Sequence, residues 1–502
     1  MRKLVSLLVA LMMIIALVPT AMADDVYTLD CYWVGNGDNT AIREGVQKAI
    51  NAYIEPLIGA NIVFHIIGWD DWNDKAINAL QSGEKMDLIF TADWEGYGVE
   101  VSGGLLLPLD DLVAQYGQGI TETLPQTFLD GVRVGGVLYG IPTNKELCVP
   151  EGFIINKTAA AEIGWDVTAD DPAIKTTADL EPYLAKYKEL HPDKYPYLMD
   201  GQNGRWADEP WAPDWAGLEN NCVAMKMAAD ENGVFDETPY SIFETEEQAE
   251  HIALMYKWGQ AGYIDPDQAL TSFDYNGTFG RGDFLVFVQP LKGNGIKAAE
   301  MYAANHTADF ECVEITMQPK YVVTTHAGGS MFGIPVTSKN PEKAMQYINL
   351  MHSDPTLVNL MLFGEEGVNY TKVNDNQVEI IPDANWYGVH GGAWTVGNTK
   401  LQYVLTSEDP EKNALLQSYA DDAVATASLG FRFVKDNVAD QIAAVSGVIK
   451  EYANPMMCGS VDPADPAQGL EALKAALADA GMADILAEVQ TQYDAWKAAQ
   501  AE

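Results

Sequence analysis

The chemistry that this sequence offers most plainly is aromatic stacking. The chain has 12 tryptophans, several of them at or beside the ends of predicted strands or in Gly-rich loops. Flat indole faces suit the apolar C–H faces of sugar rings. Core packing is the alternative for each tryptophan alone, but we expect at least two of the set to line a ligand site. The candidates are Trp33, Trp69, Trp94, Trp206, Trp211, Trp386 and Trp394.

Polar side chains near the same loops could bond to a ligand's hydroxyl groups. Each is weak as a single candidate, because a charged loop residue is usually only solvated. Asn36 lies in a Gly-x-Gly turn between a predicted strand and a helix, where backbone N–H groups can donate to a ligand oxygen. The turn lacks the third glycine of a dinucleotide loop. The polar candidates are Asn36, Asp70, Asp93, Asn144, Lys145, Glu146, Ser330, Glu365 and Glu366.

Motifs of catalysis and metal binding are missing from the sequence. There is no H-E-x-x-H, no G-x-x-x-x-G-K-[ST] and no EF-hand loop, and residues 328–332 fail the G-x-S-x-G elbow at its last position. The seven histidines do not cluster. We therefore predict no catalytic residue, no cofactor and no metal. Paired carboxylates for glycoside hydrolysis remain open, since an acid-rich chain offers many pairs.

Strand and helix patterns alternate through the first third of the chain and would position these loops. Apolar runs predict strands at 26–34, 62–67 and 86–90, and helical periodicity predicts helices at 41–54 and 72–80. This β-α-β-α-β order indicates an α/β fold with an open, mainly parallel sheet. Ligands of such sheets bind beyond the carboxyl ends of the strands, where Trp33, Trp69 and Trp94 stand.

Composition and the first residues predict an exported protein. The chain carries 72 acidic and 30 basic residues, a net charge of −42, which opposes binding to nucleic acid. Residues 1–23 have the basic start, apolar run and Ala-x-Ala end of a signal peptide; an N-terminal anchor helix is the alternative. Asp24 stands where a lipoprotein has cysteine, so we expect no lipid anchor. Five cysteines leave at least one unpaired, and we favour buried thiols over disulfides.

One segment, 328–370, carries a family pattern. An apolar strand is followed by Thr337-Ser338, suited to cap a helix, then by Lys-Asn-Pro-Glu-Lys-Ala, an amphipathic helix and a Gly-Glu-Glu-Gly loop. This segment closely resembles the family 1 extracellular solute-binding proteins, the ligand-capturing subunits of ABC importers. The stretches 103–112, 136–142, 152–157 and 244–267 also resemble that family. Residues 459–463 and the tail resemble the C-terminal extension of a subfamily described as having unknown function.

The resemblance implies a two-lobe, periplasmic-binding-protein-like (type II) fold with hinge crossovers and a helical C-terminal extension. It implies a monomer that captures a small molecule, which the tryptophans suggest is a sugar, and delivers it to the permease subunits of an ABC transporter. The membrane would be met only through that permease. A secreted carbohydrate-active enzyme, a sensor or adhesion module, and a peptide- or charged-sugar-binding protein are the alternatives. The expected division is 1–23 signal peptide, 24–141 and 320–362 first lobe, 142–319 and 363–425 second lobe, and 426–502 extension.

Overall fold

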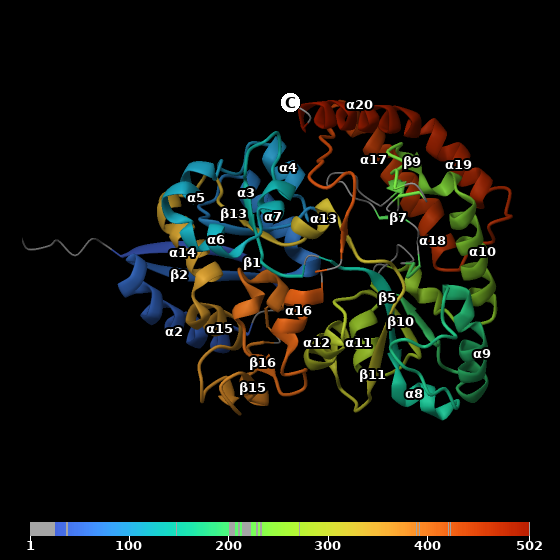
Figure 1. Cartoon of the computed structure of the whole chain (residues 1–502), viewed down its shortest axis with the longest axis horizontal. Helices are drawn as coiled ribbons and strands as arrows, with labels where there is room; N and C mark the ends of the chain where they lie inside the picture. Colours follow the sequence, from blue (N-terminus) through green and yellow to red (C-terminus); the bar gives the residue numbers. More distant parts are fainter. Residues whose placement is uncertain are drawn as a thin grey trace, which may run out of the picture.

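The computed structural model describes most of the chain after the expected signal peptide. The described residues are 26–36, 39–146, 148–199, 206–208, 211–212, 222–226, 229–230, 233–270, 272–387, 389–390, 392–419, 421 and 423–500. Figure 1 shows one sheet on the left, a second at the lower right, and the red C-terminal helices arching over the upper right. The proposed signal peptide lies outside the described residues.

The first sheet has five strands in the order β2-β1-β3-β13-β4. Its strands are β1 (Tyr27–Gly35), β2 (Ala60–Gly68), β3 (Leu88–Thr91), β4 (Gly140–Pro142) and β13 (Met331–Gly333). The first strand, β1, is parallel to both β2 and β3, as the sequence predicted. Strand β13, which returns from far along the chain, inserts antiparallel between β3 and β4. The sheet is therefore mixed, with the loops after β1, β2 and β3 at one edge.

Helices cover this sheet on both faces (Figure 1). The predicted helix at 41–54 is α2 (Thr40–Ile58), which buries Val46, Ile50, Ile54 and Ile58, one residue per turn. The predicted helix at 72–80 is instead three short pieces, η1 (Trp69–Asp71), η2 (Asn73–Ile77) and α3 (Asn78–Gln81), none with a side-chain cap. The shorter helices that follow are α4 (Tyr97–Ser102), α5 (Asp110–Tyr116), α6 (Gln118–Thr123) and α7 (Gln126–Gly131).

The family segment, preceded by α13 (Thr324–Ala327), folds into β13, α14 (Pro341–Ser353) and α15 (Pro355–Phe363). The predicted cap of α14 was wrong by two positions. Asn340 is the N-cap and accepts from the backbone N–H of Lys343. The hydroxyl of Ser338 donates instead to Asp87 at 2.6 Å, so it ties the segment to the loop before β3.

The second sheet has four strands in the order β11-β5-β10-β6, and β5 runs antiparallel to both of its neighbours. Its strands are β5 (Glu151–Asn156), β6 (Tyr197–Met199), β10 (Val286–Pro290) and β11 (Cys312–Thr316). Its helices are α8 (Lys157–Glu162), η3 (Thr177–Leu180), α9 (Glu181–Leu190), α10 (Glu246–Gln260), η6 (Pro266–Ala269), α11 (Tyr275–Gly280) and α12 (Ile296–Asn305). The predicted strand near 152–157 is β5, and the helical motif at 244–267 is α10 with its turn.

Residues 363–405 correct the expected lobe division. They form β14 (Tyr370–Lys372), β15 (Gln377–Ile380), η7 (Pro382–Ala384), η8 (Ala393–Thr395), η9 (Thr399–Leu401) and β16 (Val404–Leu405), before α16 (Lys412–Tyr419). Phe363, Trp386 and Val396 belong to the same buried cluster as the first sheet. The prediction that put 363–425 in the second lobe is therefore wrong for this part, because its apolar side chains pack under β1 and α15.

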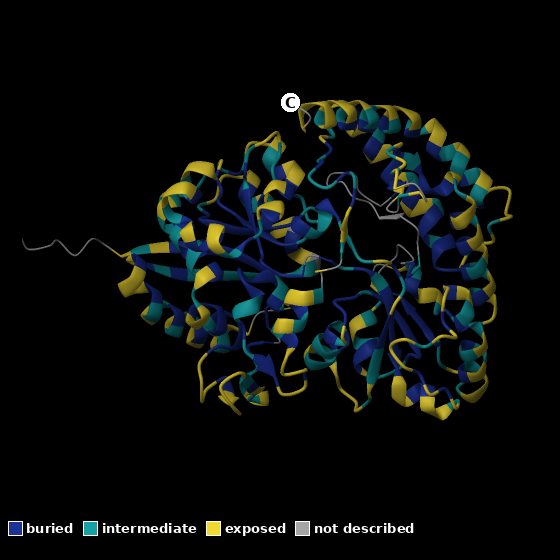
Figure 2. Ribbon diagram, viewed as in Figure 1, coloured by how far each residue is buried: buried dark blue, intermediate teal, exposed yellow. Residues whose placement is uncertain are grey.

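The C-terminal extension packs on the second lobe. Its helices are η10 (Asp436–Val438), α17 (Ala439–Val448), η11 (Ile449–Ala453), α18 (Asn454–Met457), α19 (Leu470–Asp479) and α20 (Met482–Gln500). They share a buried core with Ile252 of α10 and with β8 (Val223–Lys226), which lies between β7 (Trp211–Ala212) and β9 (Tyr240–Ser241). A Cβ on Gly259 of α10 would meet the carbonyl oxygen of Gly459 at 2.3 Å, so these helices approach closely. Figure 2 shows that the faces of the C-terminal helices turned towards the second lobe are buried.

None of the five cysteines, all of which the structure describes, is in a disulfide; four are buried and Cys312 is partly buried. The expectation of buried thiols rather than disulfides is met at four of the five positions.

Candidate functional site

Three of the predicted tryptophans meet at the carboxyl edge of the first sheet. Trp69 follows β2, Trp94 follows β3, and Trp394 lies in η8, more than 290 residues further along. The Trp69 and Trp394 rings stack with centroids 5.9 Å apart and planes 16° from parallel. Trp94 lies 5.9 Å from Trp69 and 6.1 Å from Trp394. We call Trp69, Trp94 and Trp394 the tryptophan cluster.

Hydrogen bonds fix two of these rings from their polar edges. The indole N–H of Trp69 donates to the side-chain oxygen of Asn36 at 2.9 Å, and that of Trp94 donates to the carbonyl of Gly329 at 2.9 Å. Phe90 supports the cluster edge-on against Trp394, with ring centroids 6.0 Å apart. Trp94 is nevertheless 53% exposed. The donors are thus used within the protein, and aromatic surface is left for a ligand.

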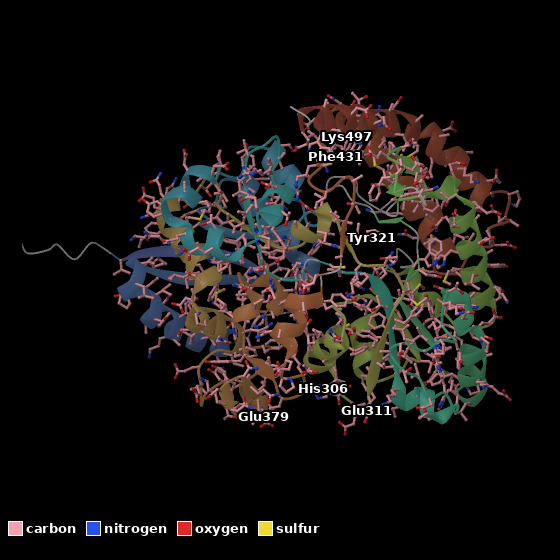
Figure 3. All side chains as sticks on the ribbon, in the orientation of Figure 1. His306, Glu311, Tyr321, Glu379, Phe431 and Lys497 are labelled. Atoms are coloured by element: carbon pink, nitrogen blue, oxygen red, sulfur yellow. The ribbon has the colours of Figure 1, made fainter. Side chains whose placement is uncertain are left out.

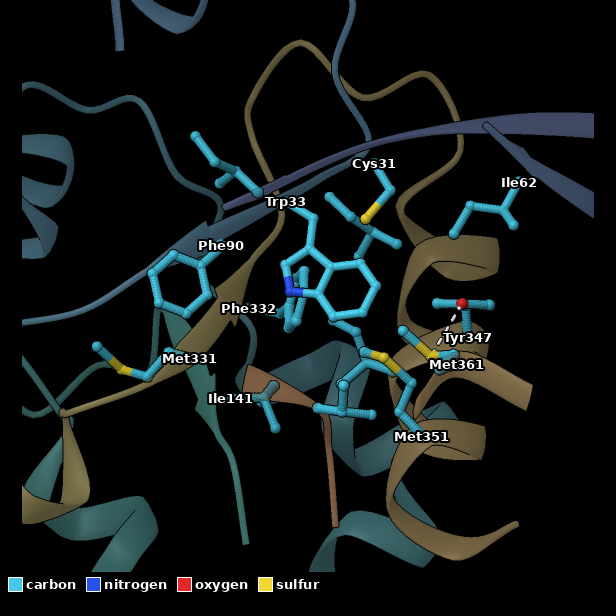
Figure 4. Packing of buried hydrophobic residues seen from close by; sticks show 14 of the residues in the cluster. Cys31, Trp33, Ile62, Phe90, Ile141, Met331, Phe332, Tyr347, Met351 and Met361 are labelled. Carbon is cyan, nitrogen blue, oxygen red and sulfur yellow. Dashed lines mark hydrogen bonds between the residues drawn. The ribbon is translucent and has the colours of Figure 1, made fainter. Parts of the chain in front are cut away.

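Trp33 and Trp386 are corrections to the predicted site. Both are fully buried, and the Trp33 ring stacks on His390 with centroids 5.2 Å apart. Their indole N–H groups donate to Thr395 (3.0 Å) and to the carbonyl of Met361 (2.7 Å). Figure 4 shows Trp33 enclosed by the core beneath the sheet. The prediction that these two rings contact ligand is wrong, because they hold the loop that carries Trp394.

Trp206, in the second lobe, does not join the cluster. Trp206 is 9% exposed, stacks on His251 with centroids 4.4 Å apart, and donates to Asp208. It belongs to the core shared with the C-terminal helices, so its predicted ligand role is corrected to packing. Trp211 lies in β7, but its side chain is outside the described residues, and its role stays a prediction. The same holds for the side chain of Asp70.

Asp93 and Ser330 are also corrections. The Asp93 carboxylate, 3% exposed, is paired with both terminal nitrogens of Arg432. Burial raises the pKa of Asp93, and the Arg432 guanidinium opposes that rise. Ser330 is fully buried and shares a hydrogen bond with Thr143. Neither side chain is available to a ligand.

Asn144, Lys145 and Glu146 lie on the first crossover, where they are buried. The Asn144 amide donates to the carbonyl of Thr123 at 2.9 Å. Lys145 lies 3.4 Å from Glu146, and Glu146 lies 3.5 Å from Lys292 after β10. The predicted ligand contacts are corrected to contacts within the hinge region.

These charges continue into a buried network that joins distant segments. Glu300 of α12 lies 2.9 Å from Lys292 and 2.9 Å from Lys412 of α16, and Lys412 lies 2.7 Å from Glu408. Burial alone would raise the pKa of Glu300, but the two lysines outweigh it and hold the pKa well below its usual range. The network therefore stays charged and ties α12 of the second lobe to α16 and to the first crossover.

Glu365 and Glu366 are exposed in the loop after α15. Glu366 pairs loosely with Lys372 at 3.9 Å, next to the β14–β15 hairpin. Figures 1 and 3 place this hairpin, with labelled Glu379, at the lower edge of the molecule. Both glutamates thus lie on an exposed loop beside this hairpin, and their role in ligand binding stays a prediction.

Two residues important to this region were missed from the sequence. Phe90 is the last apolar residue of β3 and could have been found from its place at the carboxyl end of that predicted strand. Arg432 carries no local signal, because its partner Asp93 is 339 residues away. Within the described part of the chain, no group of three or more His, Cys, Asp or Glu side chains is placed to hold a metal ion. No helix among the described residues is both long and apolar enough to cross a membrane.

The fold and the position of this site define a class of protein. Residues 49–377 match the family described as "Bacterial extracellular solute-binding protein", and the chain belongs to that family. Its architecture is the two-lobe α/β fold of these proteins with C-terminal helices added. Residues 427–498 match a second family, a domain of unknown function.

The chain is similar to particular members of this class. A protein of Streptococcus pneumoniae serotype 4 (strain ATCC BAA-334 / TIGR4), "Carbohydrate ABC transporter substrate-binding protein", is 27% identical over 91% of this chain and 89% of its own length. The N-glycan transport solute binding protein (NgtS) from Streptococcus pneumoniae, solved in complex with Man1GlcNAc, is 23% identical with a TM-score of 0.77, covering 93% of this chain and 98% of its own. The S. pneumoniae substrate binding protein FusA, solved with kestose, is 16% identical with a TM-score of 0.60, covering 94% and 99%.

Proposed function

We propose that this protein is the solute-binding subunit of an ABC importer and that it captures a carbohydrate, an oligosaccharide, between its two lobes. The observation that carries the proposal is the tryptophan cluster, in which the indole N–H groups of Trp69 and Trp94 bond within the protein while Trp94 remains 53% exposed. Sugar rings present apolar C–H faces that pack on such surfaces. Similarity to proteins named for carbohydrate transport supports the same ligand class.

The two sheets give the proposed mechanism. A sugar held on the tryptophan cluster would draw the second lobe towards it and favour the closed form by its differential affinity for closed over open. The crossovers at 143–146 and 320–328 are the proposed hinges, and residues 426–502 are proposed to move with the second lobe, whose core they share.

The remaining parts of the proposal concern setting and partners. We propose export by residues 1–23, function outside the cytoplasmic membrane as a monomer, and docking of the closed form on the permease. The ligand would leave unchanged, so the protein is not an enzyme. Membership of a solute-binding family supports this part, and the competing hypothesis is a secreted carbohydrate-active enzyme.

Intrinsic tryptophan fluorescence tests the ligand class. The purified protein is titrated with mannose–N-acetylglucosamine oligosaccharides and fructo-oligosaccharides, with a peptide mixture as the competing class. We expect saturable binding of one sugar series, and recovery of that sugar with unchanged mass. No response to any sugar would refute the carbohydrate proposal, and shortened products would favour the enzyme.

Variants of Trp94 test the site itself. Trp94→Ala removes an exposed aromatic face, and we expect affinity to fall about tenfold or more, since about 1.4 kcal/mol corresponds to a factor of ten. Trp94→Phe keeps an aromatic face and is expected to retain most binding. Leu190→Ala, at a 52% exposed apolar position of α9 in the second lobe, is the control and should bind as the parent does. Equal affinity of Trp94→Ala and the parent would place the site elsewhere.

A further inference from the structure

The C-terminal extension reaches the tryptophan cluster through one side chain. Its helices pack on the second lobe, but the segment that leads to them runs beside the crossover that returns to the first lobe. β17 (Val424–Ala425) pairs with β12 (Tyr321–Val322). The Thr324 hydroxyl then donates to the carbonyl of Ser428 (3.1 Å) and accepts from the backbone N–H of Gly430 (2.9 Å). Figure 3 shows Phe431 above Tyr321, between the first lobe and the C-terminal helices.

Two residues after Gly430, the side chain of Arg432 is buried against the first lobe. Its Nη1 and Nη2 atoms lie 2.5 and 3.0 Å from the two oxygens of Asp93, and its Nε donates to the carbonyl of Gly131 at 2.7 Å. The guanidinium also lies over the Tyr97 ring, 5.4 Å from its centroid. Only 5% of the side chain is exposed. A two-pronged contact of this kind fixes orientation as well as charge.

Asp93 transmits this contact to Trp94. Its backbone N–H donates to the carbonyl of Gly328 (2.8 Å), and the next residue, Trp94, donates to the carbonyl of Gly329 (2.9 Å). A Cβ on Gly328 would meet the Asp93 carboxylate at 1.8 Å, so the carboxylate lies directly against this backbone. The orientation of the most exposed ring of the cluster therefore depends on where the Asp93 carboxylate is held.

We propose that Arg432 is a positioning residue of the solute site: through Asp93 it sets the place of Trp94, and it thereby gives the domain of unknown function a part in ligand binding. The proposal rests on the proposed role of the tryptophan cluster. Without Arg432, Asp93 is a buried carboxylate with its charge uncompensated, and such a group protonates or moves towards water. Either change displaces Trp94 from Trp69 and Trp394.

A spectroscopic test reads Trp94 without any ligand. The full-length protein is labelled with 5-fluorotryptophan, and the Trp94 resonance in the ¹⁹F NMR spectrum is assigned by its loss in Trp94→Phe. Arg432→Gln is expected to displace or broaden this resonance while Trp165, far off in the second lobe, stays in place. Asp93→Asn combined with Arg432→Gln, which removes both charges, is expected to move it back towards the parent position. Lys497→Gln, also in the extension, removes an ion pair with Glu237 of the second lobe and should leave the Trp94 resonance unchanged.

The outcomes separate positioning from general stability. If Arg432→Gln lowers the melting temperature but leaves the Trp94 resonance where it was, the proposal is overturned. Should that variant fail to fold, Arg432→Lys, which keeps the charge and loses the two-pronged contact, is read by the same criterion. A parent protein that binds no oligosaccharide refutes the carbohydrate proposal, whereas the resonance still decides the role of Arg432.

Discussion

The buried carboxyl group of Glu100 should make the stability of this protein fall as the pH rises. It lies in α4, directly beyond the tryptophan cluster, and is 1% exposed. Burial raises its pKa to about 8; the Thr91 hydroxyl opposes the rise and the Glu95 carboxylate adds to it. The unfolded chain loses this proton near its ordinary value of 4.5, so the folded protein holds one more proton between these values. The free energy of unfolding contributed by Glu100 is therefore fully present below pH 4.5 and is lost as pH rises towards 8.

The substitution Glu100→Gln mimics the neutral side chain at every pH. Each pH unit corresponds to about 1.4 kcal/mol, so at pH 7 we expect the variant to be about 3 kcal/mol more stable than the parent. Near pH 4.5 the two should be equal. Urea unfolding followed by tryptophan fluorescence at pH 4.5, 7 and 8.5 measures the difference. Glu44→Gln, at an exposed position of α2, is the control and should parallel the parent. A difference for Glu100→Gln that is the same at all three pH values would refute the reasoning.

Two further perturbations test the contacts that join the parts of the molecule. Lys412→Met leaves the buried carboxylates of Glu300 and Glu408 without the cation between them. We expect the free energy of unfolding, measured by urea titration, to fall by about 3–5 kcal/mol. A fall below about 1 kcal/mol would contradict a charged network. Gly259→Ala drives a methyl group into the backbone carbonyl of Gly459, just after α18, and should cost about 1–3 kcal/mol and speed proteolytic release of the extension. The control is Gly447→Ala on α17, where a methyl group meets open space, and it should be neutral or slightly stabilising. Equal rates of proteolysis for the two variants would argue against close packing of α10 and α18.

Much of the local structure could be predicted because its causes are local. The helix α2 is visible in the sequence as apolar residues every fourth position, and the strands β1 and β2 as apolar runs that each end in a glycine. The cap of α14 was misplaced because Ser338 and Asn340 are both good capping residues. Asp87, 251 residues away, bonds to Ser338 and leaves Asn340 to cap the helix.

Local patterns along the chain were enough to predict the class of protein, the alternation of strands and helices, and the edge of the sheet at which tryptophans gather. Only the fold decided that Trp33 is fully buried while Trp394 is half-buried, because the two tryptophans belong to segments about 360 residues apart that pack against each other. It also decided that Asp93 faces Arg432. Burial and ion pairing depend on distances between residues far apart along the chain, and no short window of sequence contains them.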